Sequence, residues 1–243
     1  MATQRKQRKA EREFRPDPLK PLNAAQAHMI NAMQTSSSVI AVGPAGTGKT
    51  YIAAAWAAEQ LFNIKTSRIV LCRPTVGVGR SLGFLPGRLG QKLDPWARPL
   101  VDVFKQTLSA KRYEQALREE RIEVGSIEHV RGLTFEDSIV IIDEAQNTTP
   151  GELKALTTRI GEDSTIIVCG DTSQTDLPGE SGLAWLLRAH SRGWLPSSFL
   201  CKFAMADIVR SGLCREFAEA FEQLEDEQKS IRSAIDCLSL IHI

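Results

Sequence analysis

Residues 43–50 read Gly-Pro-Ala-Gly-Thr-Gly-Lys-Thr, and this short segment constrains the fold more than any other part of the chain. The run before it, residues 38–42, is apolar and rich in β-branched side chains, and residues 50–62 after it are rich in alanine. These patterns predict a buried strand, a glycine-rich loop and a helix in succession. The N–H groups of such a loop and of the helix amino terminus point toward one spot, where they favour a phosphate group.

The segment matches the pattern GxxxxGK[ST]. In this pattern the lysine, Lys49, is expected to reach the β- and γ-phosphates of a nucleotide, and Thr50 is expected to bind Mg²⁺. A chance match in a turn is the alternative, but the predicted strand before the loop and helix after it argue against it. The residues predicted to bind the nucleotide are Gly43, Pro44, Ala45, Gly46, Thr47, Gly48, Lys49 and Thr50.

A second motif is an apolar run that ends in two acids. Residues 139–142 are Ile-Val-Ile-Ile, and Asp143 and Glu144 follow them. Asp143 is the predicted Mg²⁺ ligand, directly or through water. Glu144 is the predicted residue that polarises the attacking water. The motif is weak alone but becomes specific beside the first one.

Two glutamines are candidates for further contacts with the nucleotide. Gln174 follows another apolar run, residues 165–169, and is expected to touch the γ-phosphate or orient water; a polar turn in which Asp171 caps the loop is the alternative. Gln26 precedes the glycine-rich loop, and its amide could read adenine because it both donates and accepts hydrogen bonds. The alternative for Gln26 is an exposed helix residue.

Apolar runs alternate with helical patterns along the chain, which predicts an α/β protein whose parallel sheet is covered on both faces. Ligands of such sheets bind at the carboxyl ends of the strands. The expected strands are residues 38–42, 68–72, 122–124, 138–142, 165–169 and 199–203. The expected helices are residues 23–33, 50–62, 102–120, 151–160, 181–189 and 213–228.

Composition limits the class of protein. The 243 residues fit one large domain, and a net charge of +1 says little about partners. None of the five cysteines forms a CxxC pair, so neither a disulfide framework nor a zinc site is expected. No apolar stretch approaches the ~18 residues of a membrane span, and the basic amino terminus lacks the apolar region of a secretory signal. We therefore expect a cytoplasmic protein without a membrane partner.

The chain divides into three parts. Residues 1–18 are polar and basic and are expected to form a flexible arm, either a solubilising tail or an arm that binds phosphate backbones. Residues 19–228 are the expected ATPase domain, and residues 229–243 form a carboxyl-terminal tail.

The motifs together resemble motifs I, II and III of superfamily 1 helicases, with Gln26 in the place of their adenine-reading residue. The chain is more similar still to the PhoH-like family, over about residues 20–225. This resemblance implies a RecA-like P-loop NTPase that binds ATP and Mg²⁺, hydrolyses ATP and acts in RNA metabolism. The residues that carry it are 43–50, 73–74, 82–87, 91–95, 98–100, 131–134, 143–149, 158–161, 170–171, 174, 176–178, 181–183 and 207–210.

Superfamily 1 helicases bind ATP between two RecA-like domains, and the second domain supplies an arginine. This chain has room for one such domain, so we expect a homo-oligomer, a ring or filament with a hexamer as one form, in which a neighbouring copy supplies the arginine. Such a residue accelerates hydrolysis by ~10³–10⁵. The candidates are Arg210, Arg159 and Arg131, and ordinary salt bridges are the alternative for each.

Residues 73–99 contain several arginines with interleaved aromatic residues, which suits RNA or another single-stranded nucleic acid. Arg73 and Thr75 lie where motif Ia of the helicases touches the strand. A structural loop or a subunit interface is the alternative. The preferred function is an ATPase that binds or remodels nucleic acid; an ATPase that remodels protein partners is the alternative, and a small-molecule kinase is least favoured.

Overall fold

The computed structural model describes residues 17–74, 98–127 and 134–213, together with parts of 215–227. The expected tail, residues 229–243, lies outside these ranges, and so does most of the expected arm, residues 1–18.

Six parallel strands form one sheet in the order β3-β2-β4-β5-β1-β6. The glycine-rich loop follows β1 and the acid pair follows β4, and β5 separates these two strands. The predicted α/β fold of RecA-like type is confirmed, and every expected strand is present. The strands are β1 Ser38–Val42, β2 Arg68–Arg73, β3 Ile122–Ser126, β4 Ser138–Ile142, β5 Thr165–Gly170 and β6 Ser198–Lys202.

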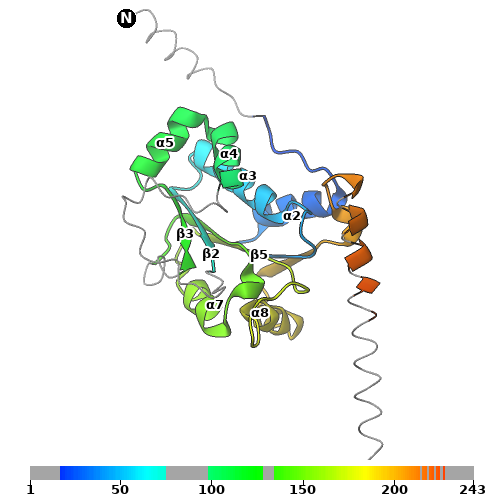
Figure 1. Ribbon diagram of the computed structural model, residues 1–243. Helices are drawn as coiled ribbons and strands as arrows, with labels where there is room; N and C mark the ends of the chain where they lie inside the picture. The colour runs from blue at the N-terminus through cyan, green and yellow to red at the C-terminus, as the bar shows by residue number, and fades with distance from the viewer. Residues whose placement is uncertain are drawn as a thin grey trace, which may run out of the picture.

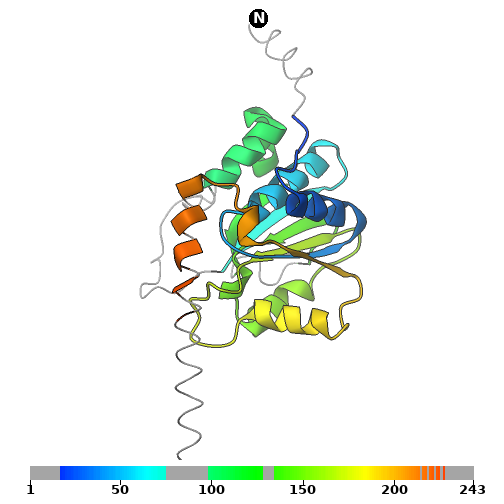
Figure 2. The ribbon, with the colours of Figure 1, turned by 90° about the vertical axis from the view of Figure 1, so that its right-hand side faces the viewer.

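Helices cover both faces of the sheet, so the fold has three layers (Figure 1). On one face lie α2 (Ala24–Thr35), α3 (Lys49–Phe62), α4 (Arg98–Leu108) and α5 (Ala110–Arg118). On the other face lie α7 (Pro150–Thr157) and α8 (Gly182–Ser191), which the turned view also shows below the sheet (Figure 2). Two short 3-10 turns, η2 (Ala145–Asn147) and η3 (Met205–Asp207), follow strands β4 and β6.

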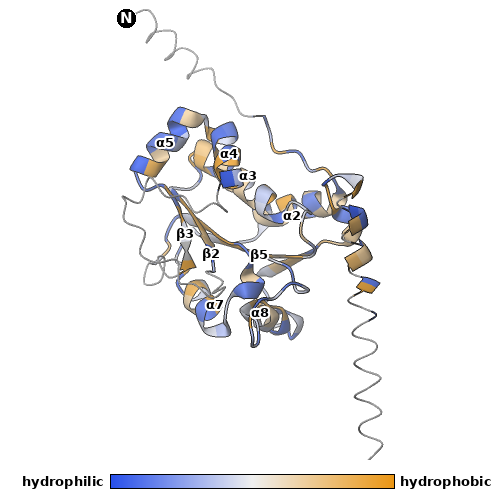
Figure 3. Ribbon diagram, in the orientation of Figure 1, coloured by the Kyte–Doolittle hydropathy of each residue, from blue (hydrophilic) through white to orange (hydrophobic). Residues whose placement is uncertain are grey.

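The central strands are continuously apolar between their ends because both of their faces are buried. In β1, Val39 and Ala41 pack in the core under α2 to α5, whereas Ile40 and Val42 pack in the core over α7 and α8. This alternation follows from the two-residue period of a strand. Hydropathy colouring shows the same arrangement, with apolar strands in the middle and polar residues on the outer sides of the helices (Figure 3).

Side-chain caps fix where several helices begin. The Asn23 side chain accepts a hydrogen bond from the backbone N–H of Gln26, as its sequence position predicts. Thr149 and Glu152 form a capping box at the start of α7. Each cap places a helix amino terminus near the carboxyl ends of the strands, where the predicted site lies.

One expected helix is two helices. The sequence predicts a single helix over residues 102–120, but the chain breaks at Ser109, whose φ is +70°. The break turns the chain, so that Phe104 of α4 and Tyr113 of α5 reach the same core and stack at 6.1 Å. The first helix also starts earlier, at Arg98, because Pro99 is tolerated in a first helical turn.

Candidate nucleotide-binding site

The glycine-rich loop closes tightly against its neighbours. The N–H of Gly43 donates to the carbonyl of Gly170 at the end of β5. Gly48 has a φ of +85° and begins α3, and a Cβ on it would lie 2.8 Å from Nε2 of Gln26. Only glycine takes this conformation without strain and leaves room for Gln26. The loop therefore presents its backbone toward the start of α3.

The Lys49 side chain lies inside this loop and is only 8% exposed. Its Nζ donates hydrogen bonds to the carbonyls of Gly43 and Pro44, both at 2.7 Å, and to Oγ1 of Thr47 at 3.2 Å. Burial lowers the pKa of Lys49, while nearby Cys169, Asp171 and Asp143 act in the opposite direction. The ammonium group is thus held at the place where the loop would bind phosphate.

Thr50 and Asp143 bring the first two motifs together. Oγ1 of Thr50 donates to Oδ1 of Asp143 at 2.6 Å. Burial raises the pKa of Asp143, and the hydrogen bond from Thr50 opposes this shift. These oxygens form a hard donor set at the carboxyl end of β4, of the kind that Mg²⁺ prefers.

Glu144 is half-buried beside them, with its backbone in the left-handed region at φ +52°. Oε2 of its carboxylate accepts a hydrogen bond from Nε2 of Gln146 at 2.5 Å. Oε1 lies 3.4 Å from Nη2 of Arg73 in an ion pair. Both oxygens of the predicted water-polarising residue therefore have partners, one from its own segment and one from the end of β2.

Gln146 is a site residue to which the sequence assigned no role. It is 2% exposed, and its Oε1 accepts from the backbone N–H of Asp171 at 3.0 Å while its amide nitrogen holds Glu144. It therefore bridges the acid pair after β4 and the loop after β5. The available signal was a polar residue directly behind the acid pair, in a segment that belongs to the family resemblance.

The loop after β5 contains a buried acid. Oδ1 of Asp171 accepts from the N–H and the hydroxyl of Ser173, which confirms that Asp171 caps this turn. Oδ2 of Asp171 has no hydrogen-bond partner among the described residues, although it is buried. Gln174 lies farther along the same loop, exposed at the rim of the cavity.

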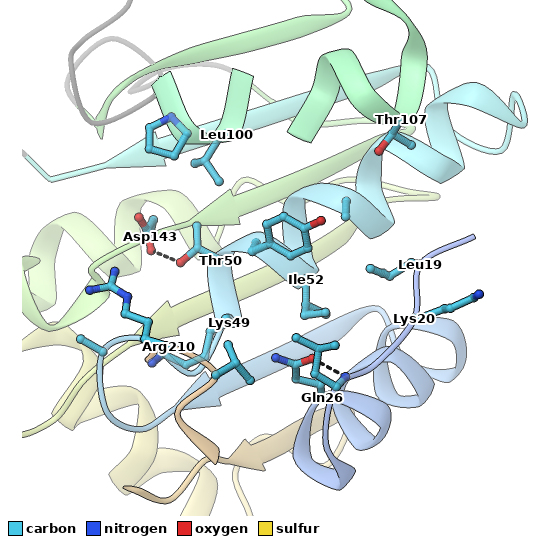
Figure 4. A pocket seen from close by; sticks show the side chains of 18 of the residues that line it. Leu19, Lys20, Gln26, Lys49, Thr50, Ile52, Leu100, Thr107, Asp143 and Arg210 are labelled. Carbon is cyan, nitrogen blue, oxygen red and sulfur yellow. Dashed lines mark hydrogen bonds between the residues drawn. The ribbon is translucent and has the colours of Figure 1, made fainter. Parts of the chain in front are cut away.

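A cavity of about 970 Å³ joins these groups (Figure 4). Lys49, Thr50, Asp143 and Arg210 line it on the side of the glycine-rich loop. Gln26 lies in its wall together with residues 17–20 and Leu22. The cavity thus contains the predicted phosphate, metal and base contacts in one continuous space.

Gln26 is a buried part of this wall, 2% exposed, and is therefore not an exposed helix residue. Its Oε1 accepts from the backbone N–H of Leu22 at 2.8 Å, and its Nε2 donates to the carbonyl of Thr47 at 3.0 Å. These bonds fix the amide orientation and leave one N–H and one oxygen lone pair for a ligand.

The candidate arginines lie in different places. The side chain of Arg210 packs over Gly46 of its own chain, so that a Cβ on Gly46 would lie 3.1 Å from Cδ of Arg210. Arg159 follows α7 at the amino-terminal edge of the sheet, because its carbonyl accepts from the N–H of Phe135 ahead of β4. Arg159 is therefore remote from the loop of its own chain. Arg131 and Thr75 lie outside the described residues.

Within the described residues no group of three or more His, Cys, Asp or Glu side chains could hold a metal ion by itself. No helix in the described part of the chain is long and apolar enough to cross a membrane. Cys72, Cys169 and Cys201 are buried free thiols.

The parallel sheet, the strand–loop–helix unit and the acid pair at the end of β4 define a RecA-like P-loop NTPase fold. The chain belongs to the PhoH-like protein family, whose family model matches residues 18–222.

Relatives from several bacteria share this similarity. A PhoH-like protein of Synechocystis sp. is 41% identical over 83% of this chain and 61% of the relative. The PhoH-like protein of Bacillus subtilis is 40% identical over 82% of this chain and 62% of the relative. Protein PhoH of Escherichia coli is 39% identical over 84% of this chain and 58% of the relative. The chain thus spans about three fifths of the length of these curated relatives.

Solved structures with a related arrangement are more distant. The UvsW helicase from bacteriophage T4 has 12% sequence identity and a TM-score of 0.45, over 79% of this chain and 62% of that one. The large terminase from a thermophilic bacteriophage has 8% identity and a TM-score of 0.47, over 82% of this chain and 50% of that one.

Proposed function

We propose that this protein binds ATP with Mg²⁺, hydrolyses it, and couples hydrolysis to RNA or another single-stranded nucleic acid. The observation that carries the proposal is the bond between Thr50 and Asp143, which lies between Lys49 and Glu144 in one cavity. A nucleotide whose phosphates enter the glycine-rich loop would meet an ammonium group, a set of oxygen ligands and a carboxylate in turn.

The residues present fit Mg²⁺. This ion is usually held by one or two carboxylates together with substrate phosphates, and Thr50 and Asp143 offer oxygens beside the loop. Asp171, whose buried Oδ2 has no partner among the described residues, lines the same cavity. Bound there, Mg²⁺ would neutralise charge that develops on the phosphates.

Other side chains have roles that do not involve the metal. Lys49 would bind the β- and γ-phosphates in place of the loop carbonyls it now contacts. Glu144 would accept a hydrogen bond from the attacking water and orient it. Gln174 at the rim and Arg210 over Gly46 would contact the γ-phosphate side. In this proposal Arg210 acts on the nucleotide of its own chain.

Gln26 would select the base. The N–H that it has left can donate to N7 of adenine, and its free lone pair can accept from the 6-amino group. Guanine has acceptors at both positions. Because Leu22 and Thr47 fix the amide, rotating it to suit guanine would break two hydrogen bonds. We therefore propose a preference for ATP over GTP.

Nucleic-acid binding rests on Arg73, which ends β2 at the edge of the site and is partly exposed. The proposal also includes a ring-shaped homo-oligomer and a cytoplasmic location. It keeps the division of the chain into an arm, a domain and a tail. Sedimentation over a range of protein concentrations would test the ring.

The decisive experiment is steady-state phosphate release from ATP, with and without single-stranded RNA and DNA, for the wild type and Glu144→Gln. Stimulation by nucleic acid that is lost in Glu144→Gln would support the proposal. A hydrolysis rate that nucleic acid does not change would favour an ATPase that remodels proteins. A wild type that binds ATP but does not hydrolyse it would indicate a nucleotide-binding module.

A further inference from the structure

We propose that Arg73 is a positioning residue that restrains Glu144, and that a nucleic-acid phosphate releases this restraint by taking the same guanidinium group. The inference rests on the proposed function and adds the contact through which nucleic-acid binding would act on the nucleotide site. It predicts that the enzyme is slow without nucleic acid because its water-polarising carboxylate is occupied.

The place of Arg73 is set by the sheet. Strands β2 and β4 are parallel neighbours, with Cys72 opposite Ile142, and the N–H of Asp143 donates to the carbonyl of Cys72 at 2.9 Å. Arg73, the last residue of β2, and Asp143, the first residue after β4, therefore lie at the same edge of the sheet. Arg73 comes to lie beside the acid pair through backbone pairing, so the contact does not depend on a chance loop conformation.

The contact engages the carboxylate of Glu144 on one side only. Its Oε1 lies 3.4 Å from Nη2 of Arg73, whereas Oε2 accepts from Gln146 at 2.5 Å. A carboxylate whose two oxygens face a cation and an amide has less capacity to accept a hydrogen bond from water. If Arg73 leaves, Gln146 still orients the group and Oε1 becomes free for water.

The pair is suited to exchange. The side chains of Arg73 and Glu144 are 31% and 34% exposed, and ion pairs with such exposure are weak. A phosphate can bind a guanidinium group through two parallel hydrogen bonds, a stronger arrangement than an ion pair at 3.4 Å. A nucleic-acid phosphate that reaches the end of β2 would therefore displace the carboxylate of Glu144 from Arg73.

The same strand provides a matched control. Arg68, at the other end of β2, forms an ion pair with Glu123, and these side chains are 27% and 30% exposed. Strand β2 separates the two arginines by five residue steps, roughly 17 Å. Arg68→Ala removes an ion pair of similar exposure, which is also hydrogen-bonded and lies away from the nucleotide site.

The test measures kcat and KM for ATP, with and without single-stranded polyuridine, for the wild type, Arg73→Ala, Arg73→Lys and Arg68→Ala. Arg73→Ala should raise kcat without RNA about two- to fivefold, the range that corresponds to a weak ion pair, and should abolish stimulation. Arg73→Lys keeps the charge and should keep part of the stimulation. Arg68→Ala should match the wild type in both states.

Two results would overturn the inference itself, and a third would defeat the function on which it rests. If kcat without RNA is unchanged in a folded Arg73→Ala protein, Arg73 does not restrain Glu144 and can only be a nucleic-acid ligand. Loss of hydrolysis in both Arg73 variants, with ATP affinity retained, would make Arg73 a required group instead of a restraint. A wild type that hydrolyses no ATP under any condition would instead defeat the proposed function on which the inference rests.

Discussion

The hydroxyl of Thr50 and the carboxylate of Asp143 lie 2.6 Å apart although 93 positions separate them in the sequence. The bond joins the first turn of α3 to the end of β4 and so fixes the two motifs relative to each other. Asp143 is 8% exposed, and the hydroxyl offsets part of the cost of burying its charge. The proposed Mg²⁺ ligands are therefore already in place around one spot.

Replacing Thr50 should weaken Mg²⁺-dependent nucleotide binding. Thr50→Ala removes one of the two proposed protein ligands of Mg²⁺, so we expect roughly a ten- to hundredfold loss in affinity for Mg²⁺–ATP. Thr50→Ser keeps the hydroxyl and should stay within a few-fold of the wild type. Titration calorimetry with ATP at varied Mg²⁺ checks this, and equal affinities for the two variants would exclude a metal role for Thr50.

Gln146 should matter more for turnover than for ATP affinity. Gln146→Leu leaves the N–H of Asp171 without its acceptor, so we expect a loss of ~1–3 kcal/mol in stability. It also removes the amide that orients the carboxylate of Glu144, so we expect a marked fall in kcat. Gln115→Leu is the control, because Gln115 makes a similar bond to Glu119 on an exposed helix surface. Urea melts and phosphate release measure both effects; a full kcat in Gln146→Leu would contradict the bridging role.

Much of this fold was predictable because its signals are local. The loop at residues 43–50, the strands before and after it, and the caps at Asn23 and Thr149 each depend on neighbours in the sequence. Fully apolar runs such as residues 139–142 indicate a strand buried on both faces. The acid pair was recognisable because it ends such a run.

The parts that the sequence missed or left open depend on contacts between distant segments. The sequence pattern continues through Ser109, and only packing of both α4 and α5 on one core turns the chain there. Gln26 was predicted to read adenine, and only the packing of α2 against the loop excludes the alternative of an exposed helix residue. Arg210 was one of three candidates for an arginine supplied by a neighbouring copy, and its position over Gly46 of its own chain depends on how the chain returns after β6.

Gly48→Ala should destabilise the protein and impair nucleotide binding. A residue other than glycine at a φ of +85° costs ~1–2 kcal/mol, and the new methyl group would also displace the amide of Gln26. Gly193→Ala has a similar φ of +72° but open space around it, so it should show the strain alone. Melting temperatures and ATP affinities of both variants separate the two effects; normal ATP binding by Gly48→Ala would show that Gln26 need not stay in place.

Tyr113 should give the protein an alkaline instability that phenylalanine removes. Its hydroxyl is buried without a hydrogen-bond partner among the described residues, so Tyr113→Phe should be more stable at neutral pH, by about 1 kcal/mol. Burial raises the pKa of Tyr113 to about 12 from 10.0. The unfolded chain therefore loses this proton first, and the stability linked to it is complete below about pH 10 and falls between about pH 10 and 12.

Melting temperatures over this range should fall more steeply for the wild type than for Tyr113→Phe. Tyr51→Phe, at an exposed tyrosine, should change stability at neutral pH by less than about 0.5 kcal/mol. Parallel curves for the wild type and Tyr113→Phe would mean that the hydroxyl is hydrated, and that α5 packs less closely on the core than its stacking with Phe104 indicates.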